Sequence, residues 1–123
     1  MNGIVLPTLA LLLGVALGVQ VSKSRKSPPG FYIAEVLVTN AEDFKPYAAN
    51  VPATIERYGG RYLVRGGVIE GLEGEPPKRL IVTAFPTPAD ARKWYESPEY
   101  SAIRPIRLRS ATTRAFIVEG VGE

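Results

Sequence analysis

Cysteine and histidine are both absent from this sequence of 123 residues. Without cysteine there can be no disulfide, no thiolate nucleophile and no cysteine-ligated metal. Without histidine the chain lacks the commonest general base and the commonest metal ligand, so it cannot build a Ser-His-Asp or Cys-His catalytic site by itself. The acidic residues are scattered, and no G-x-G-x-x-G or Walker-type loop is present. We therefore expect no bound metal and no resident cofactor.

Most of the chain also lacks a basic excess, although the net charge is +3. Lys23, Arg25 and Lys26 account for this charge, because the remaining twelve Lys and Arg residues balance the twelve Asp and Glu residues. A nucleic-acid-binding domain is expected to carry its basic excess on the folded part, so we expect no nucleic-acid partner. The three cations instead follow an apolar segment, where they indicate a membrane.

That segment, Ile4–Val21, has eighteen residues and no charge, close to the shortest helix that crosses roughly 30 Å of hydrocarbon. Two interpretations of residues 1–22 stay open. A single-pass transmembrane anchor would leave the following domain in the cytoplasm by the positive-inside rule. A secretory signal peptide would be cleaved, and the domain would be periplasmic or secreted. The absence of Lys and Arg before the apolar run favours the anchor. Residues 23–30 read as a basic Pro/Gly linker.

Four later segments have the β-branched and aromatic content of strands. They are Phe31–Val38, Arg61–Arg65, Arg79–Phe85 and Arg114–Glu119. Gly66 and Gly67 are expected to form a bulge in the second strand, with pairing resumed over Val68–Leu72.

Helical signals separate these strands. Asn40 can cap a helix that Gly59 ends in the left-handed conformation. Pro46 and Pro52 within it predict a loose first turn and a kink. Thr87 and Ser97, each followed by proline, are expected to cap two further helices, the second of which Pro105 limits.

This order, β-α-β-β-α-β, predicts an α+β fold of the ferredoxin-like type over residues 31–121, preceded by an N-terminal apolar helix. It has a four-stranded antiparallel sheet with the helices on one face. The strands are apolar on both faces, so the face without helices would leave a large apolar patch in water. A second copy packed sheet to sheet would cover it, and we expect a homodimer through this face.

Three stretches of this sequence resemble the domain of unknown function 1330 family, within the dimeric α+β barrel superfamily. They are VPATIERYGGRYLVRGG, LEGEPPKR and WYESPEYSAIRPIR. The resemblance covers residues 31–121 and implies a ferredoxin-like fold whose two sheets close into a barrel in the dimer. It implies no established reaction. Relatives in the superfamily include cofactor-independent monooxygenases, several of which use a histidine that this chain lacks. Family members often carry an N-terminal export signal, which supports the cleaved-signal interpretation.

Catalytic candidates are the few polar residues that the strands could present to a cavity, together with one tyrosine. They are Glu35, Arg65, Arg79 and Tyr95. Strand alternation places Arg65 on the same face as Arg61. A buried carboxylate beside a guanidinium is a candidate functional site, and the alternative is a structural ion pair that fixes register.

A second set of candidates could bind a flat organic ligand through aromatic rings with polar tips. The set comprises Tyr47, Trp94, Tyr95, Ser97, Tyr100 and Arg104. The alternative is ordinary core packing with a helix cap. Arg104, with Arg107 and Arg109, could also hold a carboxylate or phosphate, or could form a solvated basic face.

Three functions remain open from the sequence. The first is an uncharacterised small dimeric barrel that binds a small apolar or aromatic molecule, tethered to the membrane through Ile4–Val21 or exported. The second is a cofactor-independent enzyme of the monooxygenase or isomerase type, in which a carboxylate or tyrosine accepts a proton and an arginine stabilises negative charge. The third is a structural or interaction module.

Overall fold

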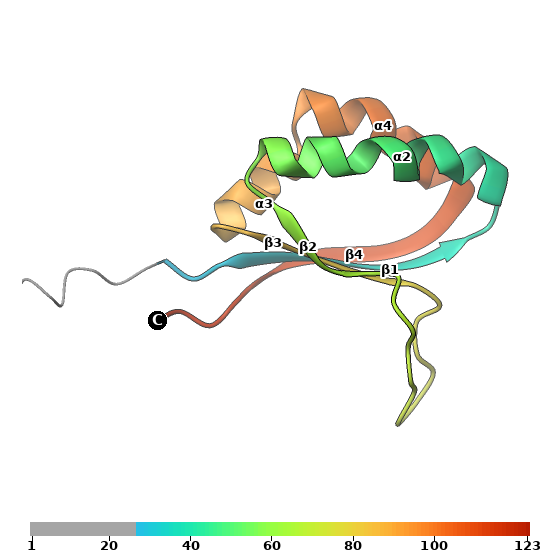
Figure 1. Ribbon diagram of the computed structural model, residues 1–123, viewed down its shortest axis with the longest axis horizontal. Helices are drawn as coiled ribbons and strands as arrows, with labels where there is room; N and C mark the ends of the chain where they lie inside the picture. The colour runs from blue at the N-terminus through green and yellow to red at the C-terminus, as the bar shows by residue number, and fades with distance from the viewer. Residues whose placement is uncertain (1–26) are drawn as a thin grey trace, which may run out of the picture.

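The computed structural model describes residues 27–123, and the predicted apolar helix over Ile4–Val21 lies outside them. The strands are β1 (Gly30–Val38), β2 (Arg61–Arg65), β3 (Leu80–Phe85) and β4 (Ala111–Glu119); the helices are α2 (Ala41–Arg57), α3 (Pro88–Tyr95) and α4 (Pro98–Ser110). The sheet order is β2-β3-β1-β4, and every pairing is antiparallel. Figure 1 shows the helices on one face of this sheet. The predicted α+β arrangement is therefore confirmed.

Among residues 27–123, no helix has the length and hydropathy needed to cross a membrane.

Helix α2 is continuous through both of its prolines. The Asn40 side chain accepts a hydrogen bond from the Asp43 backbone N–H at 3.1 Å. This cap holds the first turn, so the expected loose turn before Pro46 is wrong. Pro52 has no N–H and leaves the Ala48 carbonyl without its helical donor. Arg65 provides the missing donor, because its Nη2 donates to the Ala48 carbonyl at 3.0 Å.

Strand β2 contains the bulge, but not where the glycines predicted it. Tyr62 pairs with Thr83 and Val64 with Val82, so Leu63 is the extra residue. The strand ends at Arg65, and the pairing expected over Val68–Leu72 is not formed.

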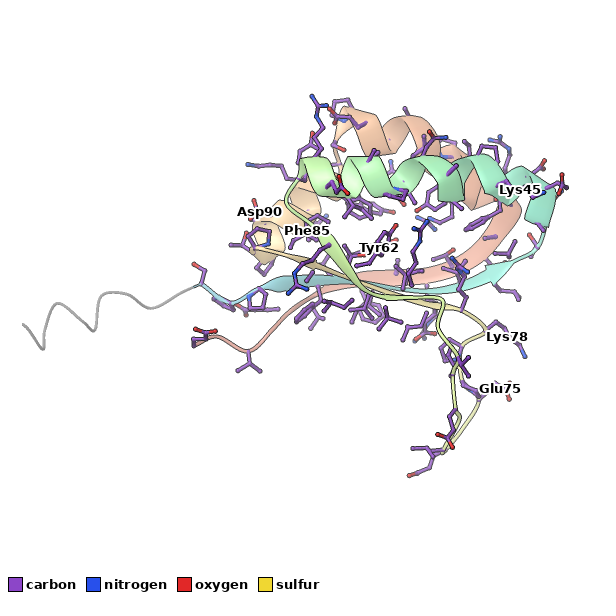
Figure 2. All side chains as sticks on the ribbon, in the orientation of Figure 1. Lys45, Tyr62, Glu75, Lys78, Phe85 and Asp90 are labelled. Carbon is purple, nitrogen blue, oxygen red and sulfur yellow. The ribbon has the colours of Figure 1, made fainter. Side chains whose placement is uncertain are left out.

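Residues 66–79 form an arm that leaves the sheet on the side opposite the helices (Figure 1). Glu75 and Lys78 lie on this arm, whereas Tyr62 and Phe85 point into the space between sheet and helices (Figure 2).

Both caps expected in the second half of the chain are present. Thr87 accepts from the Asp90 N–H and Ser97 from the Tyr100 N–H, each at 3.1 Å. Helix α4 runs on past Pro105 to Ser110, so the limit expected at this proline is wrong. Pro105 is exposed, and the opposite face of α4 stays packed across it.

The core between sheet and helices is an aromatic cluster centred on Trp94, which is fully buried. Its ring centroid lies 4.2 Å from that of Tyr100, 4.8 Å from that of Tyr32 and 5.5 Å from that of Phe85. The indole Nε1 donates to the Thr54 hydroxyl at 3.0 Å. A buried indole needs such a partner, and the bond ties α3 to α2.

The face of the sheet without helices, called here the open face, is apolar and exposed. Its exposed large side chains are Leu37, Leu63, Val64, Phe116 and Val118. The arm carries two further exposed apolar side chains, Val68 and Leu72, on the same side of the sheet. The homodimer expected through this face stays a prediction.

Candidate functional site

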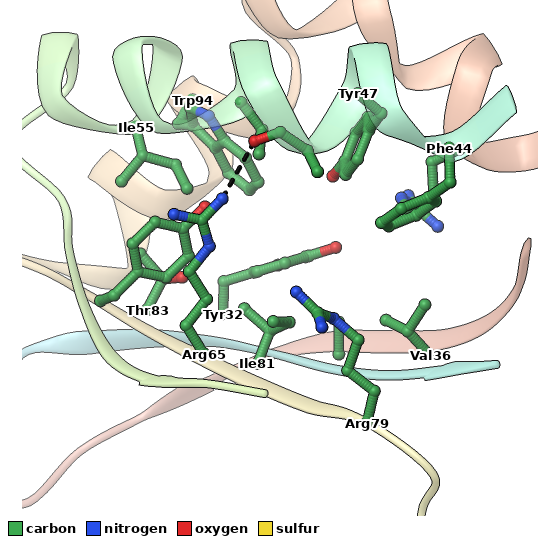
Figure 3. Close-up of a pocket in the computed structure, with 15 residues that line it drawn as sticks. Tyr32, Val36, Phe44, Tyr47, Ile55, Arg65, Arg79, Ile81, Thr83 and Trp94 are labelled. Carbon is green, nitrogen blue, oxygen red and sulfur yellow. Dashed lines mark hydrogen bonds between the residues drawn. The ribbon is translucent and has the colours of Figure 1, made fainter. Parts of the chain in front are cut away.

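A pocket lies between α2 and the helix-covered face of the sheet (Figure 3). Its floor includes Tyr32 of β1 and Thr83 of β3, its roof includes Tyr47 of α2, and three arginines line it, Arg65, Arg79 and Arg107. The space in this pocket that the centre of a water molecule can reach is about 30 Å³, enough for roughly two waters. The whole hollow, with its solvent-open mouth, measures about 460 Å³.

Two tyrosines and an arginine form a buried hydrogen-bonded group at one side of the pocket, called here the Tyr-Tyr-Arg network. The hydroxyls of Tyr47 and Tyr100 lie 2.8 Å apart, and Arg107 Nε donates to the Tyr100 hydroxyl at 3.3 Å. Arg107 is only 4 % exposed. No carboxylate within residues 27–123 forms a salt bridge with it. A buried charge without an opposite partner is costly, so this guanidinium is a candidate functional group.

Burial sets the charge states of Tyr32, Tyr47 and Arg107 beside the pocket. It raises the pKa of both Tyr32 and Tyr47, with the neighbouring Tyr100 as the second cause. Burial alone would lower the pKa of Arg107, but attraction to Tyr32, Tyr100 and Tyr47 outweighs it, and the net direction is upward. At neutral pH the phenols of Tyr32 and Tyr47 are therefore neutral hydrogen-bond donors and the Arg107 guanidinium is charged. A tyrosinate acting as proton acceptor does not fit this environment.

Two buried hydroxyls in the pocket floor have no hydrogen-bond partner among the described residues. They belong to Tyr32 and Thr83, which face each other across the β1–β3 ladder. In Figure 3 the Tyr32 and Tyr47 hydroxyls and the Arg79 guanidinium point toward the same space. An unpaired buried polar group costs about 1–3 kcal/mol. A ligand that accepts hydrogen bonds here would relieve that cost.

Arg65 reaches the pocket because of the bulge at Leu63. The extra residue turns Arg65 to the same face as Tyr62, so the predicted common face of Arg65 and Arg61 is wrong. The Arg65 guanidinium lies 4.7 Å from the centre of the Tyr62 ring and is held by the Ala48 carbonyl, the bond drawn as a dashed line in Figure 3. Arg79, just before β3, lines the pocket from the sheet side.

Residues 29–121 match a domain of unknown function, DUF1330. The chain belongs to the DUF1330 family. No curated protein matches it.

Solved structures share the fold of this DUF1330 domain. A protein of unknown function from Rhodopseudomonas palustris is 16 % identical, with a TM-score of 0.60 over 86 % of this chain and 92 % of its own. Its methylated form gives 17 % identity and 0.63 over 86 % and 90 %. SnoaB, a cofactor-independent oxygenase from Streptomyces nogalater, is 12 % identical, with a TM-score of 0.55 over 75 % of this chain and 92 % of its own. At these identities the likeness shows the fold alone.

Glu35 of the DUF1330 domain does not join the pocket. It lies on the open face, where Arg114 Nη2 is 3.4 Å from its carboxylate, and both side chains are partly exposed. Arg65 and Arg79 line the pocket on the other face. The structure therefore separates the candidate carboxylate from the two candidate guanidinium groups. Within residues 27–123, no three acidic side chains are close enough to hold a metal ion.

The aromatic candidates are brought together, but they divide between two roles. Tyr47 and Trp94 line the pocket, and Tyr100 supports it from behind through the Tyr-Tyr-Arg network. Ser97 is a helix cap, and its hydroxyl also donates to the Trp94 carbonyl at 2.7 Å.

Tyr95 lies apart from this pocket, in a shallower depression beside Phe116. Arg104 lies over the Tyr95 ring at 4.7 Å and donates to the Tyr95 carbonyl at 2.9 Å. Arg109 is exposed. The three arginines of α4 therefore do not form one anion clamp.

Sequence reasoning missed Tyr32 and Thr83 as site residues and named Arg107 only within a basic run. One signal was available for Arg107, because it follows Tyr100 by seven residues and so shares its helix face after two turns. For the two hydroxyls, strand alternation gives the face, but their pairing depends on the register between β1 and β3.

Proposed function

We propose that this DUF1330 domain is a homodimeric small-molecule-binding protein that takes an apolar or aromatic ligand between α2 and the sheet. One observation carries the proposal: an apolar-walled pocket whose lining includes two buried hydroxyls without partners among the described residues, those of Tyr32 and Thr83. Binding pockets combine such walls with a few converging polar groups.

Replacing Thr83 by valine tests this proposal. The change keeps the shape of the side chain and removes the unpaired hydroxyl, so the free protein should gain about 1 kcal/mol of stability. If the hydroxyl serves a ligand, the same variant should bind aromatic small molecules more weakly than the parent chain. Binding is measured by ligand-induced thermal stabilisation and calorimetry.

Thr113→Val provides a matched control. The Thr113 hydroxyl is also buried without a partner among the described residues, but Thr113 does not line the pocket. Its removal should raise stability similarly and leave ligand binding unchanged. Equal binding by both variants, or saturable binding by neither variant nor parent, would count against the pocket and favour an interaction module.

The homodimer rests on the open face and the arm beside it. Leu63 on edge strand β2 is 46 % exposed, and Phe116 on the opposite edge strand β4 is 45 % exposed, on a face that no other part of residues 27–123 covers. Leu72 on the arm is 86 % exposed on the same side. Several exposed apolar side chains on one face mark a protein interface, and a second copy supplies a self-complementary one.

Phe116→Lys should convert the dimer into a monomer in sedimentation velocity. Leu108→Lys is the control, because Leu108 is exposed on α4, away from the open face. A parent chain that is monomeric at micromolar concentration would overturn the dimer. A Phe116→Lys dimer as stable as the parent dimer would place the interface elsewhere.

A cofactor-independent monooxygenase-like or isomerase-like enzyme is the second candidate, supported by the shared fold with SnoaB. Ligand binding is favoured over it because the pocket lining contains no carboxylate and its Tyr32 and Tyr47 stay protonated. A panel of quinols and flavonoids with an oxygen electrode separates the two. Oxygen uptake that Thr83→Val lowers and Thr113→Val leaves unchanged would establish the enzyme.

A further inference from the structure

We infer that the ligand of this pocket carries a carboxylate head group on an apolar body. This inference rests on the proposed binding function and specifies its ligand class. It follows from the distribution of charge and unpaired donors around the pocket.

Three guanidinium groups from three separate parts of the chain line one pocket. Arg65 comes from β2, Arg79 from the end of the arm and Arg107 from α4. No acidic residue lines the pocket, and none of the three forms a salt bridge within residues 27–123. The pocket lining therefore carries positive charge that its own residues do not balance. An anion bound in the pocket offsets this charge, which a neutral ligand cannot do.

The unpaired donors lie where a carboxylate head group would need them. Arg107 uses only Nε in a hydrogen bond with the described protein atoms, which leaves its Nη donors for a ligand. The buried Tyr32 and Thr83 hydroxyls have no partner among the described residues. Ionised carboxylates accept about four hydrogen bonds and offer no donor of their own. This matches a pocket rich in donors.

The shape of the pocket distinguishes the head group from the body of the ligand. The pocket has about 30 Å³ of space for the centres of water molecules, enough for roughly two waters, which the two oxygens of a carboxylate can replace. A phosphate is tetrahedral and has more oxygens than a planar carboxylate, so it needs more room. The pocket walls are apolar, with Val36, Val51 and Ile55 among the lining residues. An aromatic or branched aliphatic body suits these walls.

The Arg107 charge has another stabilising contact, but a weak one. Its guanidinium carbon lies 5.9 Å from the centre of the Tyr47 ring, at the outer limit for a cation–π interaction. If this contact and the Tyr100 hydroxyl were the whole role of Arg107, ligand charge would make no difference to binding. The comparison of charged and neutral ligands therefore tests the inference directly.

The experiment compares carboxylates with their neutral amides on the full chain. The pairs are phenylacetate with phenylacetamide, benzoate with benzamide, and hexanoate with hexanamide, measured by calorimetry at pH 7. At least one carboxylate should bind about tenfold to a hundredfold more tightly than its amide, because hydrogen bonds to charged groups are the strong ones. Phenyl phosphate, the fourth probe, should bind more weakly than the best carboxylate.

Arginine variants locate the effect. Arg107→Gln should remove the preference for the carboxylate, and Arg79→Gln, at a partly exposed position that tolerates change, should reduce it. Arg109→Gln removes the same charge from an exposed site outside the pocket and should leave the preference intact. If Arg107→Gln fails to fold, the effect of Arg79→Gln on the preference for carboxylate over amide tests the inference alone.

The outcomes separate this inference from the proposed function. Amides that bind as tightly as their carboxylates would overturn the anionic head group and leave the binding function standing. Absence of binding by every probe at millimolar concentration would overturn both. Tighter binding of phenyl phosphate would overturn the carboxylate, and an equal loss in Arg79→Gln and Arg109→Gln would show general charge attraction instead of a site.

Discussion

Replacing Tyr100 by phenylalanine tests how the buried polar group beside the pocket is held together. The Tyr100 hydroxyl contacts both other members of the Tyr-Tyr-Arg network, at 2.8 Å from the Tyr47 hydroxyl and 3.3 Å from Arg107 Nε. The Tyr47 and Arg107 groups have no hydrogen bond to each other. Removing the central hydroxyl therefore leaves two buried donors unpaired, one of them charged.

The size of the effect follows from that count. Each buried donor left without a partner costs about 1–3 kcal/mol, and a charged one more, so Tyr100→Phe should lower the free energy of unfolding by about 3 kcal/mol. Tyr47→Phe removes a peripheral hydroxyl, and Tyr100 keeps its bond from Arg107. This variant should cost about 1 kcal/mol. The double variant should cost no more than Tyr100→Phe, because the Tyr47 donor is gone as well.

Urea unfolding at one fixed protein concentration measures all three variants. The concentration must be fixed because dimerisation would add to the apparent stability. A Tyr47→Phe variant as destabilised as Tyr100→Phe would refute the central role of the Tyr100 hydroxyl. Additive losses in the double variant would show that the two tyrosines act independently.

Two further predictions concern side-chain contacts, and a third concerns the N-terminal segment. Thr54→Val should cost about 1–3 kcal/mol by leaving the buried Trp94 indole N–H unpaired, whereas Thr54→Ser should cost less, as urea unfolding would show. The Tyr58 hydroxyl donates to the Glu99 carboxylate at 2.7 Å and lowers the pKa of Glu99 below its usual 4.5. The bond therefore stabilises the fold above pH 4.5, and this stabilisation is lost as the pH falls and Glu99 is protonated. Tyr58→Phe should reduce the loss of stability below pH 4.5, as urea unfolding at a series of pH values would show. N-terminal sequencing of the native protein should give residue 1 for an anchor and a start within 22–30 for a cleaved signal.

The regular part of the fold was predictable because its signals are local. Asn40, Thr87 and Ser97 are short polar residues ahead of apolar periodicity, and each caps the helix expected after it. Gly59 has the positive φ of 82° that a helix stop requires. These features depend on neighbours within a few residues. Strand order then follows from the few topologies that such a sequence of elements allows.

The candidate site was less predictable because it depends on contacts between distant segments. Glu35 and Arg65 were expected as possible partners, yet they lie on opposite faces of the sheet. Alternation alone cannot reveal a one-residue bulge, and a single extra residue reverses every later side chain in the strand. The Tyr32 and Thr83 hydroxyls become a site only through the register of two strands about fifty positions apart.

The position of Arg65 depends on two interruptions of regular structure acting together. The extra Leu63 turns Arg65 from the open face to the pocket face. Pro52 then supplies the fixed acceptor above it, because a proline at that position frees the Ala48 carbonyl. In a β2 without the extra residue, alternation would return Arg65 to the open face. The pocket would then keep two of its three guanidinium groups, and the Ala48 carbonyl would lose its donor. The bulge and the proline therefore act together to hold Arg65 in the pocket.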